Sequence, residues 1–360
     1  MIYLGYKLQD FHQIDLMKRI VIGSGVRKDL PKHLRELGVS DPLVIISGAT
    51  ETHNIAREIG DILSSERYEV HIFKISTSSA EEVERLHNEI SKDLKIVRGV
   101  IGVGGGKAID SAKYIAWRLS ANFISVPTVP SHDGIASPFT SLRGLPTIVS
   151  IRTTTPLMIL ADMEIISRSP KRYLIAGVGD LVGKYTAVLD WRLAHNLLGE
   201  YYAEYAASLA LHSVRHVLSS WERIRYGTVE GYRIVVEGLI SSGVAMCIAG
   251  STRPASGSEH LFSHALDKIA NYPALHGEQV GVGTIMMSYL HGKNWMKIKK
   301  ILEKLGAPTT ARELGVSEDK IIEALVIAHK IRPDRYTILG RDGLSREAAE
   351  RLARITGVIP

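Results

Sequence analysis

A run of three glycines lies where a buried strand is expected to turn into a helix. Residues 101–110 read IGVGGGKAID, so that an apolar run leads into Gly104, Gly105 and Gly106, and Lys107 begins the expected helix. Glycines let the backbone approach a phosphate closely, and the free N–H groups of a helix N-terminus favour negative charge. The pattern predicts a pyrophosphate site, and the alternative is a tight turn that binds no ligand.

This loop matches neither of the two common phosphate-binding fingerprints. Counted from Gly102, a G-x-G-x-x-G motif would need glycine where Lys107 stands. A Walker A motif ending at Gly106 and Lys107 would need glycine at Ile101 and Ser or Thr at Ala108. A kinase or an ATPase is therefore disfavoured.

A second polar loop, VPTVPSHDGIASPFTS at residues 126–141, follows the next expected strand. Because consecutive strand-to-helix loops of a parallel sheet lie at one edge, its polar side chains are expected near the glycine loop. These are Thr128, Ser131, Asp133 and Ser137. The alternative is a polar connection stiffened by proline.

Three residues of the second half have the types that bind a catalytic metal: Asp180 in GVGDLVGK, His260 in SGSEHLFSH and His276 in ALHGEQVGVG. Two imidazoles and a carboxylate form a common zinc set that leaves one position open for water or substrate. His260 and His264 are four residues apart and share a helix face. A metalloprotease is disfavoured because HLFSH lacks the glutamate of H-E-x-x-H.

The alternative for each histidine is a hydrogen-bonded or solvent-facing side chain with no metal. His212 and His216 have the same spacing in a helix that is expected to lie at the surface. Spacing alone therefore does not identify a ligand pair.

The elements that must position these residues alternate in the first half. Short apolar runs indicate strands at Leu43–Gly48, Glu69–Ile75, Val100–Gly104 and Phe123–Pro127. Helical spacing separates them at Glu51–Leu63, Ala80–Leu94 and Lys107–Leu119. This alternation predicts a Rossmann-like α/β domain with a doubly wound parallel sheet.

The second half is expected to be entirely helical. Helical periodicity covers Ala203–Arg225, Tyr232–Ala249 and Glu259–Ile269. Turn-forming and charged residues near Ser169 and Pro170 divide the chain into an α/β domain at residues 1–169 and an all-α metal- and substrate-binding domain at residues 170–360. A ligand cleft is expected between the two halves.

Composition excludes several classes of protein. The 360 residues are 45% hydrophobic and 23% charged, which is typical of globular chains rather than disordered or fibrous ones. The longest apolar candidate, Gly238–Gly250, is short for a membrane span and is expected to be a buried core helix. The single cysteine, Cys247, excludes cysteine metal clusters and internal disulfides.

The net charge and the start of the chain bear on where the protein is located in the cell and on which molecules it binds. The start of the chain lacks a secretory signal, so a cytoplasmic location is expected. A net charge of +6 fits an anionic small molecule or nucleic acid, but no nucleic-acid-binding motif or basic tail is present. We therefore expect a small-molecule substrate, no nucleic acid and no integral membrane association. A homo-oligomer is the general expectation.

Taken together and in order, these motifs resemble those of the iron-containing alcohol dehydrogenase and dehydroquinate synthase superfamily. The resemblance covers most of the chain and is carried by IGVGGGKAID, SVPTVPSHDGIAS, GVGDLVGK, GSEHLFSHALD and ALHGEQVGVG. Within this superfamily the chain is most similar to the archaeal sn-glycerol-1-phosphate dehydrogenases, particularly through VPSHDGIASPFTSL and GSEHLFSHALD.

The resemblance implies a cofactor, NAD or NADP, and one metal ion per subunit. It implies Asp180, His260 and His276 as metal ligands, and Asp133, Asp180 and His264 as substrate contacts. Cofactor contacts would be Gly104, Gly105, Gly106, Lys107, Ala108, Asp110, Thr128, Val129, Pro130, Ser131 and Ser137.

One position departs from the pattern of the iron-dependent members. They carry a fourth ligand, a histidine, one helical turn after the aspartate, whereas this chain has Lys184 there. With three ligands left, Zn²⁺ is favoured over Fe²⁺. Lys184 would share a helix face with Asp180 and place an ammonium near a substrate phosphate, and the alternative is a surface lysine with a solvated head.

The function implied is reversible reduction of dihydroxyacetone phosphate by NAD(P)H to sn-glycerol 1-phosphate, the backbone of archaeal membrane phospholipids. Zinc would polarise the ketone, His264 or a bound water would protonate the alkoxide, and Asp133 would hold a hydroxyl. The alternatives are a glycerol dehydrogenase, which needs no phosphate contact, and a dehydroquinate synthase, which shows no net change in its cofactor.

Overall fold

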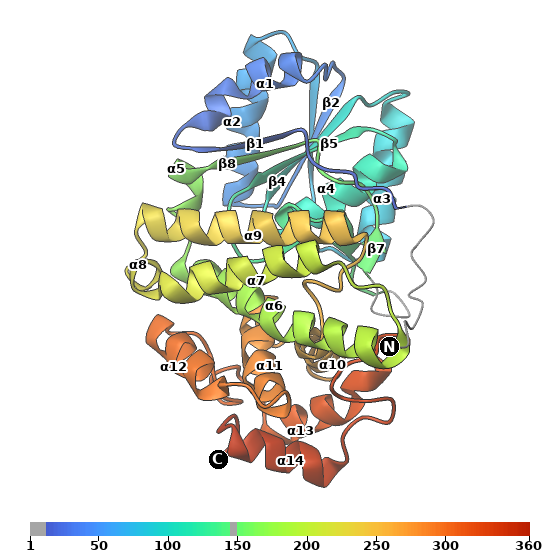
Figure 1. Ribbon diagram of the computed structural model, residues 1–360. Coiled ribbons are helices and arrows are strands. Elements are labelled where there is room, and N and C mark those ends of the chain that lie inside the picture. The colour runs from blue at the N-terminus through green and yellow to red at the C-terminus, as the bar shows by residue number, and fades with distance from the viewer. Residues whose placement is uncertain (1–11, 145–149) are drawn as a thin grey trace. The chain divides into compact units, whose positions relative to one another are not determined.

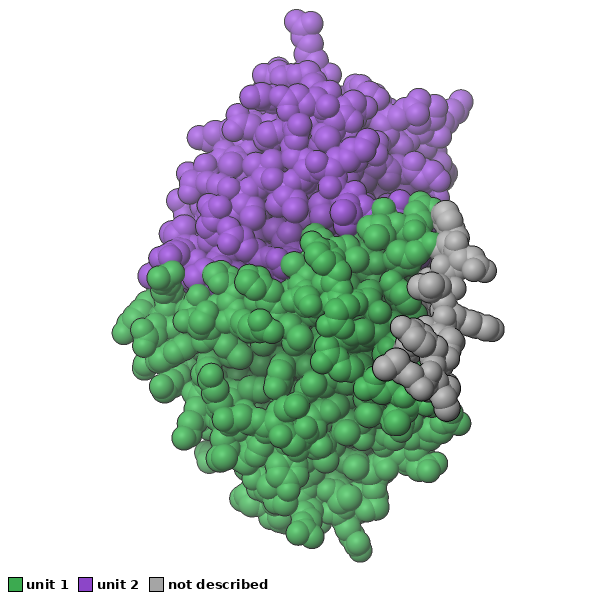
Figure 2. All heavy atoms as spheres, in the orientation of Figure 1, with its two compact units in different colours: residues 1–14, 175–226, 244–360 green, residues 15–174, 227–243 purple. Residues whose placement is uncertain are grey.

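The computed structural model describes residues 12–144 and 150–360 (Figure 1). The chain folds into two compact units (Figure 2). Of the described residues, one unit contains those of 15–174 and 227–243, and the other contains residues 12–14, 175–226 and 244–360. The predicted division into a domain at residues 1–169 and a domain at residues 170–360 stays a prediction.

The first unit is built on a parallel six-stranded sheet. Its strand order is β1-β8-β5-β4-β2-β3. The strands are β1 (Arg19–Gly23), β2 (Leu43–Ser47), β3 (Val70–Lys74), β4 (Gly99–Gly104), β5 (Asn122–Pro127) and β8 (Met158–Asp162). In the register of β4 and β5, Gly104 lies opposite Pro127. The loops after these two strands therefore start side by side, as the sequence predicts.

Helices cover both faces of this sheet, which confirms the doubly wound α/β prediction. Along β2, Ile45 packs with α1 (Leu30–Glu36) and α2 (Glu51–Ser65). Val44 and Ile46 point the other way and pack with α3 (Ala80–Asp93) and α4 (Gly106–Arg118). The period-two alternation of a strand explains why neighbouring residues enter different cores.

All four predicted strands are present, and the structure adds others. Sequence analysis missed β1 and β8, which pair with each other. β1 reads RIVIG, a β-branched run of only three residues between Arg19 and Gly23, and β8 reads MILAD, with one β-branched residue. A small antiparallel pair, β6 (Phe139–Ser141) and β7 (Ser150–Arg152), was also missed.

From Lys171 onward the described chain forms helices and no strands, as predicted. The α-helices are α6 (Lys171–Leu198), α7 (Glu204–Ser219), α8 (Trp221–Arg225), α9 (Val229–Ala249), α10 (Ser258–Ala270), α11 (His276–Leu290), α12 (Trp295–Leu305), α13 (Glu318–Ile327) and α14 (Arg346–Ile355). Short helices are η1 (Val26–Asp29), η2 (Asp133–Ile135), η3 (Ala328–Lys330) and α5 (Met163–Ile166).

Two helix predictions need correction. The expected single helix Ala203–Arg225 is divided at Ser220, whose N–H bonds to the carbonyls of His216 and Val217 and closes α7 with a tight turn. The expected core helix Gly238–Gly250 is the second part of α9, which begins at Val229. Within the described chain, α9 alone is long and apolar enough to cross a membrane, but 72% of its most apolar window is buried, as in a core helix.

The core of the second unit fixes two helices that carry predicted site residues. Leu261, Phe262 and Leu266 of α10 pack against Val282 and Met286 of α11. Residues of α13 and α14 complete this cluster. Since packed interiors resist displacement, side chains on α10 and α11 are held at fixed separations.

Candidate active site

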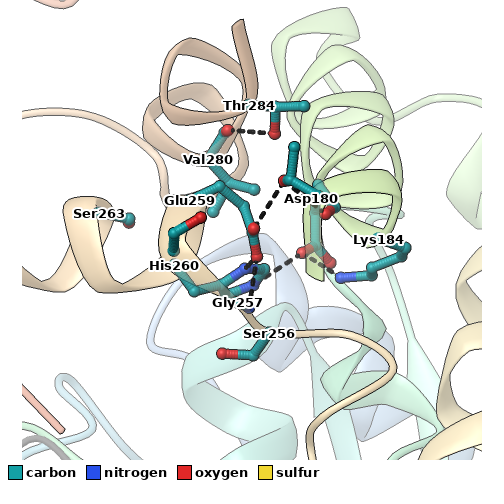
Figure 3. Close-up of polar contacts among 12 residues, drawn as sticks. Asp180, Lys184, Ser256, Gly257, Glu259, His260, Ser263, Val280 and Thr284 are labelled. Carbon is teal, nitrogen blue, oxygen red and sulfur yellow. Dashed lines mark hydrogen bonds and ion pairs between the residues drawn. The ribbon is translucent and has the colours of Figure 1, made fainter. Parts of the chain in front are cut away.

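The α6 helix places a buried ion pair in the second unit. Asp180 and Lys184 are one turn apart, and Lys184 Nζ lies 2.6 Å from Asp180 Oδ1 (Figure 3). The side chain of Lys184 is fully buried, which excludes the alternative of a surface lysine with a solvated head. Burial raises the pKa of Asp180, but the ammonium of Lys184 and the imidazole of His260 lower it well below its ordinary value. Asp180 is therefore a carboxylate.

His260, near the start of α10, faces the same carboxylate. Its Nε2 lies 3.4 Å from Asp180 Oδ1. Its Nδ1 lies 2.7 Å from Glu259 Oε1, and Glu259 also accepts hydrogen bonds from Thr186 Oγ1 at 2.6 Å and from the N–H of Gly257 at 2.6 Å. An imidazole whose one nitrogen donates to a carboxylate presents the other nitrogen as a ligand. Glu259 thus orients His260.

His276 is the first residue of α11 and completes this cluster. The ring centroids of His260 and His276 are 5.0 Å apart. Ser263 Oγ lies 3.2 Å from His276 Nδ1, and Ser263 and Gln279 are connected by a further hydrogen bond. This contact to Nδ1 orients the imidazole at the helix start.

A close approach of α6 and α11 brings Asp180 to His276. A Cβ on Gly277 would lie 1.8 Å from the carbonyl oxygen of Ala176, and one on Gly179 would lie 2.1 Å from the carbonyl oxygen of Gly277. Only glycine fits at these two positions, because any side chain would separate the helices. The glycines beside Asp180 and His276 in the sequence therefore have a packing role.

The three predicted ligands lie close enough to hold one metal ion. Asp180, His260 and His276 each offer one ligand atom, and these atoms lie within 4.8 Å of one another. One carboxylate and two imidazoles, with an orienting carboxylate behind His260, fit the chemistry of a catalytic zinc site. A second group of the same kind, formed by His264, Asp267 and His276, shares one member with it.

His264 lies beside these ligands on the next turn of α10. Its ring stacks on His276 at a centroid distance of 5.6 Å. Burial is the largest cause that holds its pKa well below the ordinary value, and the neighbouring His276 and Arg332 act in the same direction. His264 is thus a neutral imidazole. His212 and His216, in contrast, are exposed on α7, as predicted.

In the first unit the two predicted cofactor loops meet. The N–H of Thr128, directly after β5, donates to the carbonyl of Gly104 at the end of β4. Thr128 is buried, and its Oγ1 has no hydrogen-bond partner among the described residues. A Cβ on Gly106, the first residue of α4, would lie 2.3 Å from His132 Nε2. A free helix N-terminus, a crowded glycine and a buried hydroxyl form a cradle that fits a phosphate.

Several predicted cofactor residues have other contacts. Lys107 is exposed, and its Nζ donates to the carbonyl of Ser76 at 3.3 Å. Asp110 is buried, and its Oδ1 lies 3.6 Å from Lys113 Nζ. Ser137 donates its hydroxyl to the carbonyl of Phe139. Ala108 and Pro130 are buried, whereas Val129 and Ser131 are half-buried.

Asp133 lies in η2, in the loop that follows β5. Its Oδ2 accepts a hydrogen bond from Ser242 Oγ at 2.8 Å. Sequence reasoning missed a buried lysine behind this loop: Lys113 Nζ donates to the carbonyls of Gly134 at 2.7 Å and Phe139 at 2.8 Å. The signal that could have found it is an isolated lysine on the apolar face of α4.

Comparisons with known proteins agree with this architecture. A family model described as iron-containing alcohol dehydrogenase matches residues 21–170. Among solved structures, a glycerol dehydrogenase from Schizosaccharomyces pombe has a TM-score of 0.76 at 21% identity, over 96% of this chain and 90% of that chain. A probable glycerol dehydrogenase from Sinorhizobium meliloti 1021 has a TM-score of 0.79 at 18% identity, over 97% and 100%. Because these sequence identities are low, the two solved structures show only that the fold is shared.

Curated relatives are much more similar in sequence. The glycerol-1-phosphate dehydrogenase, NAD(P)+, of Hyperthermus butylicus is 54% identical over 97% of this chain and 99% of its own. Relatives with the same name are 53% identical in Aeropyrum pernix and 52% identical in Pyrococcus furiosus, again over 97% of this chain and 99% and 100% of their own. The chain therefore belongs to the glycerol-1-phosphate dehydrogenase family, whose fold is that of the iron-containing alcohol dehydrogenases.

Proposed function

We propose that the protein catalyses the reversible reduction of dihydroxyacetone phosphate to sn-glycerol 1-phosphate with NADH or NADPH. This reaction supplies the glycerophosphate backbone of archaeal membrane phospholipids, in the cytoplasm. The observation that carries the proposal is the identity of about half, over nearly whole chains, with relatives named glycerol-1-phosphate dehydrogenase. The cluster of Asp180, His260 and His276 supplies the chemistry that such a reaction needs.

The metal in this proposal is one Zn²⁺ per chain, held by Asp180, His260 and His276. When bound, zinc acts as a Lewis acid on the substrate oxygen. Three protein ligands with one open position are typical of catalytic zinc, and Lys184 stands where a fourth ligand would be. A second group that could hold a metal, His264, Asp267 and His276, shares one member with the first. We assign the metal to the first group, because these are the ligands that the family resemblance implies.

The remaining side chains of this cluster orient the ligands and the substrate. Glu259 holds the Nδ1 side of His260, and Lys184 keeps Asp180 ionised in a buried site. His264 is positioned to hydrogen-bond a substrate hydroxyl as a neutral imidazole, which can donate from one nitrogen and accept at the other. Asp133, which lies in the first unit and accepts a hydrogen bond from Ser242, is proposed separately to accept a second substrate hydroxyl.

The dinucleotide phosphates are assigned to the cradle formed by the loops after β4 and β5. The N-terminal N–H groups of α4 attract the negative charge, and Thr128 Oγ1 gains the partner that it lacks. Gly106 keeps the approach to these N–H groups open beside His132. The protein itself supplies no hydride, so its task here is to bind and orient the cofactor.

The substrate proposal is tested by comparing dihydroxyacetone phosphate with unphosphorylated dihydroxyacetone. The zinc-loaded protein is mixed with NADH or NADPH and either ketone, and the loss of reduced-nicotinamide absorbance is followed. A strong preference for the phosphate supports the proposal. Equal or better turnover of dihydroxyacetone would make the protein a glycerol dehydrogenase instead.

A further inference from the structure

Three arginine side chains gather around the segment that leads into α10. They are Arg253, in that segment, and Arg332 and Arg335, which follow η3. Arg253 and Arg332 are buried, with 4% and 9% of their surfaces exposed, and Arg335 is half-buried. A buried charge is costly unless it is paired or hydrogen-bonded, and Arg253 and Arg335 differ in the groups that they contact.

Arg253 is explained by contacts within the protein. Its Nε donates to Glu200 Oε1 at 2.6 Å, and its Nη2 contacts Glu200 Oε2. Its Nη1 donates to the carbonyl of Tyr336 at 2.8 Å. This two-point contact with a carboxylate neutralises Arg253 and gives it a structural role.

Arg335 is in a different situation. It donates to two neutral oxygens, the carbonyl of Ser256 at 2.6 Å and Thr252 Oγ1 at 2.7 Å. Within the described part of the chain, no carboxylate lies at ion-pair distance from Arg335. Burial, and then the charges of Arg332 and Arg253, lower the pKa of Arg335 to about 9. A bound anion would remove this electrostatic cost.

Arg332 shares one of these contacts. Its Nη1 lies 3.5 Å from Thr252 Oγ1, so the same hydroxyl oxygen joins both arginines. A hydroxyl that accepts from a guanidinium retains its own proton as a donor. Thr252, Arg332 and Arg335 together form the donor cluster discussed below.

The donor cluster adjoins the proposed metal ligands in the same unit. Arg335 holds the carbonyl of Ser256, and the next residue, Gly257, donates to the Glu259 carboxylate that orients His260. Figure 3 shows Ser256 and Gly257 next to His260. The charges of Arg332 and Arg335 also act on the imidazole of His264, one turn further along α10.

We propose that Arg332, Arg335 and Thr252 bind the phosphate of the substrate, a phosphate monoester dianion. This inference rests on the proposed function and names the residues that select the phosphorylated ketone. Guanidinium groups present planar pairs of N–H donors that match phosphate oxygens, and two positive charges match a dianion. The sequence suggested that Lys184 contacts the phosphate, but its side chain is fully buried in its contact with Asp180. We therefore assign phosphate binding to the arginines instead.

Substitution of the arginines tests the assignment. In Arg335→Met and Arg332→Met, kcat/KM for dihydroxyacetone phosphate should fall about 10- to 100-fold each, as expected for loss of a hydrogen bond to a charged group. The value for dihydroxyacetone should fall much less, because that ketone has no phosphate, so the ratio of the two values measures the phosphate contact. Arg335→Lys keeps the charge and should lose less. Arg215→Met, which removes an exposed arginine from α7, is the matched control.

A merely structural role predicts that both substrates lose activity together, and that result would overturn the proposal. So would variants that keep the wild-type preference for the phosphate. If instead the wild type shows no preference, the proposed function itself fails. These outcomes are distinguishable because the wild-type ratio is measured first.

Binding of inorganic phosphate supplies a second readout that needs neither turnover nor cofactor. Thermal unfolding of the wild-type protein is followed with increasing inorganic phosphate at constant ionic strength. We expect stabilisation that saturates, and about 3- to 10-fold weaker phosphate binding in Arg335→Lys, which keeps the charge but loses the paired N–H donors. If phosphate does not stabilise the wild type, or stabilises the variant equally, the donor cluster is not a phosphate site. This measurement uses the wild type and Arg335→Lys, so it tests phosphate binding by the donor cluster even if the Met variants fold poorly.

Discussion

Lys184 Nζ and Asp180 Oδ1 are 2.6 Å apart on successive turns of α6, and both side chains are buried. In the iron-dependent proteins that this chain resembles, the position of Lys184 carries a histidine ligand. Here an ammonium that cannot bind a metal while protonated neutralises the carboxylate that would bind it. In the proposed metal site the pair therefore leaves three ligands, and it keeps the aspartate ionised.

Removal of that ammonium should destabilise the protein without metal. Lys184→Met leaves the buried Asp180 carboxylate without its ionic partner, which typically costs about 3 kcal/mol of the free energy of unfolding. Added Zn²⁺ should recover much of this loss, because the metal supplies positive charge at the same oxygen. Chemical denaturation with and without zinc measures both effects. Lys300→Met, at an exposed position of α12, is the control, and equal losses in the two variants would contradict the account.

The metal site should depend on His260. His260→Ala removes one of three proposed ligands, so bound zinc and reductase activity should disappear together. The metal content of purified protein, measured by atomic absorption, checks this. His212→Ala changes a histidine with the same helical spacing on an exposed face and should retain both. Full zinc retention in His260→Ala would remove this residue from the ligand set.

The cofactor cradle should not tolerate a side chain at Gly106. In Gly106→Ala the new Cβ would lie 2.3 Å from His132 Nε2, so the ring must move. The new methyl group and the displaced ring would crowd the α4 N–H groups, so NADH binding should weaken about 5-fold or more, the equivalent of about 1 kcal/mol. Fluorescence titration of NADH, without substrate, measures the dissociation constant. Gly281→Ala, where the nearest atom is at an ordinary 3.5 Å, should bind NADH normally. Unchanged binding in both variants would argue against the cradle.

Protonation of Asp162, at the end of β8, should lower the free energy of unfolding of the protein at acid pH. Asp162 is fully buried and accepts from Arg27 Nη1 at 2.9 Å. Burial raises its pKa, but the hydrogen bonds from Arg27 and from backbone N–H groups lower it below the ordinary value. A carboxyl whose pKa is lowered by folding stabilises the protein above its unfolded pKa, and this contribution is lost as the pH falls through the folded value.

Asp162→Asn should therefore lower the free energy of unfolding at neutral pH by about 3 kcal/mol and flatten its decline below about pH 4. Urea denaturation over a pH series provides the measurement. Glu58→Gln removes a more exposed partner of the same Arg27 at 2.8 Å and should cost less than about 1 kcal/mol. An acid decline as steep in Asp162→Asn as in the wild type would assign the effect to other groups.

Local patterns in the sequence were sufficient for much of the fold and part of the site. β2 to β5 were predictable because they are apolar runs rich in β-branched residues between turn residues, although β3, unlike the other three, is only half-buried. The ligand triad was predictable because residue types and family resemblance pointed to it, and helix packing then brought Asp180 to His276. β1 and β8 were missed because the β-branched run of β1 has only three residues and MILAD has a single β-branched residue.

Interactions between segments that are distant in the sequence could not be predicted from the sequence alone. The role of Glu259 depends on which side of His260 it contacts, and its neighbour position alone does not determine that. Arg332 and Arg335 meet Thr252 from about 80 residues away, and only the folded helices bring them together. The close contact of Gly179 with Gly277 likewise has no local signal beyond the glycines themselves.

The configuration of the product tests the central claim most directly. Glycerol phosphate formed from dihydroxyacetone phosphate and NADH or NADPH is isolated and offered to an enzyme that oxidises only sn-glycerol 3-phosphate. The account predicts that the product resists this oxidation, since it is sn-glycerol 1-phosphate. A product that is fully consumed would be the opposite enantiomer, and the proposed function would be wrong.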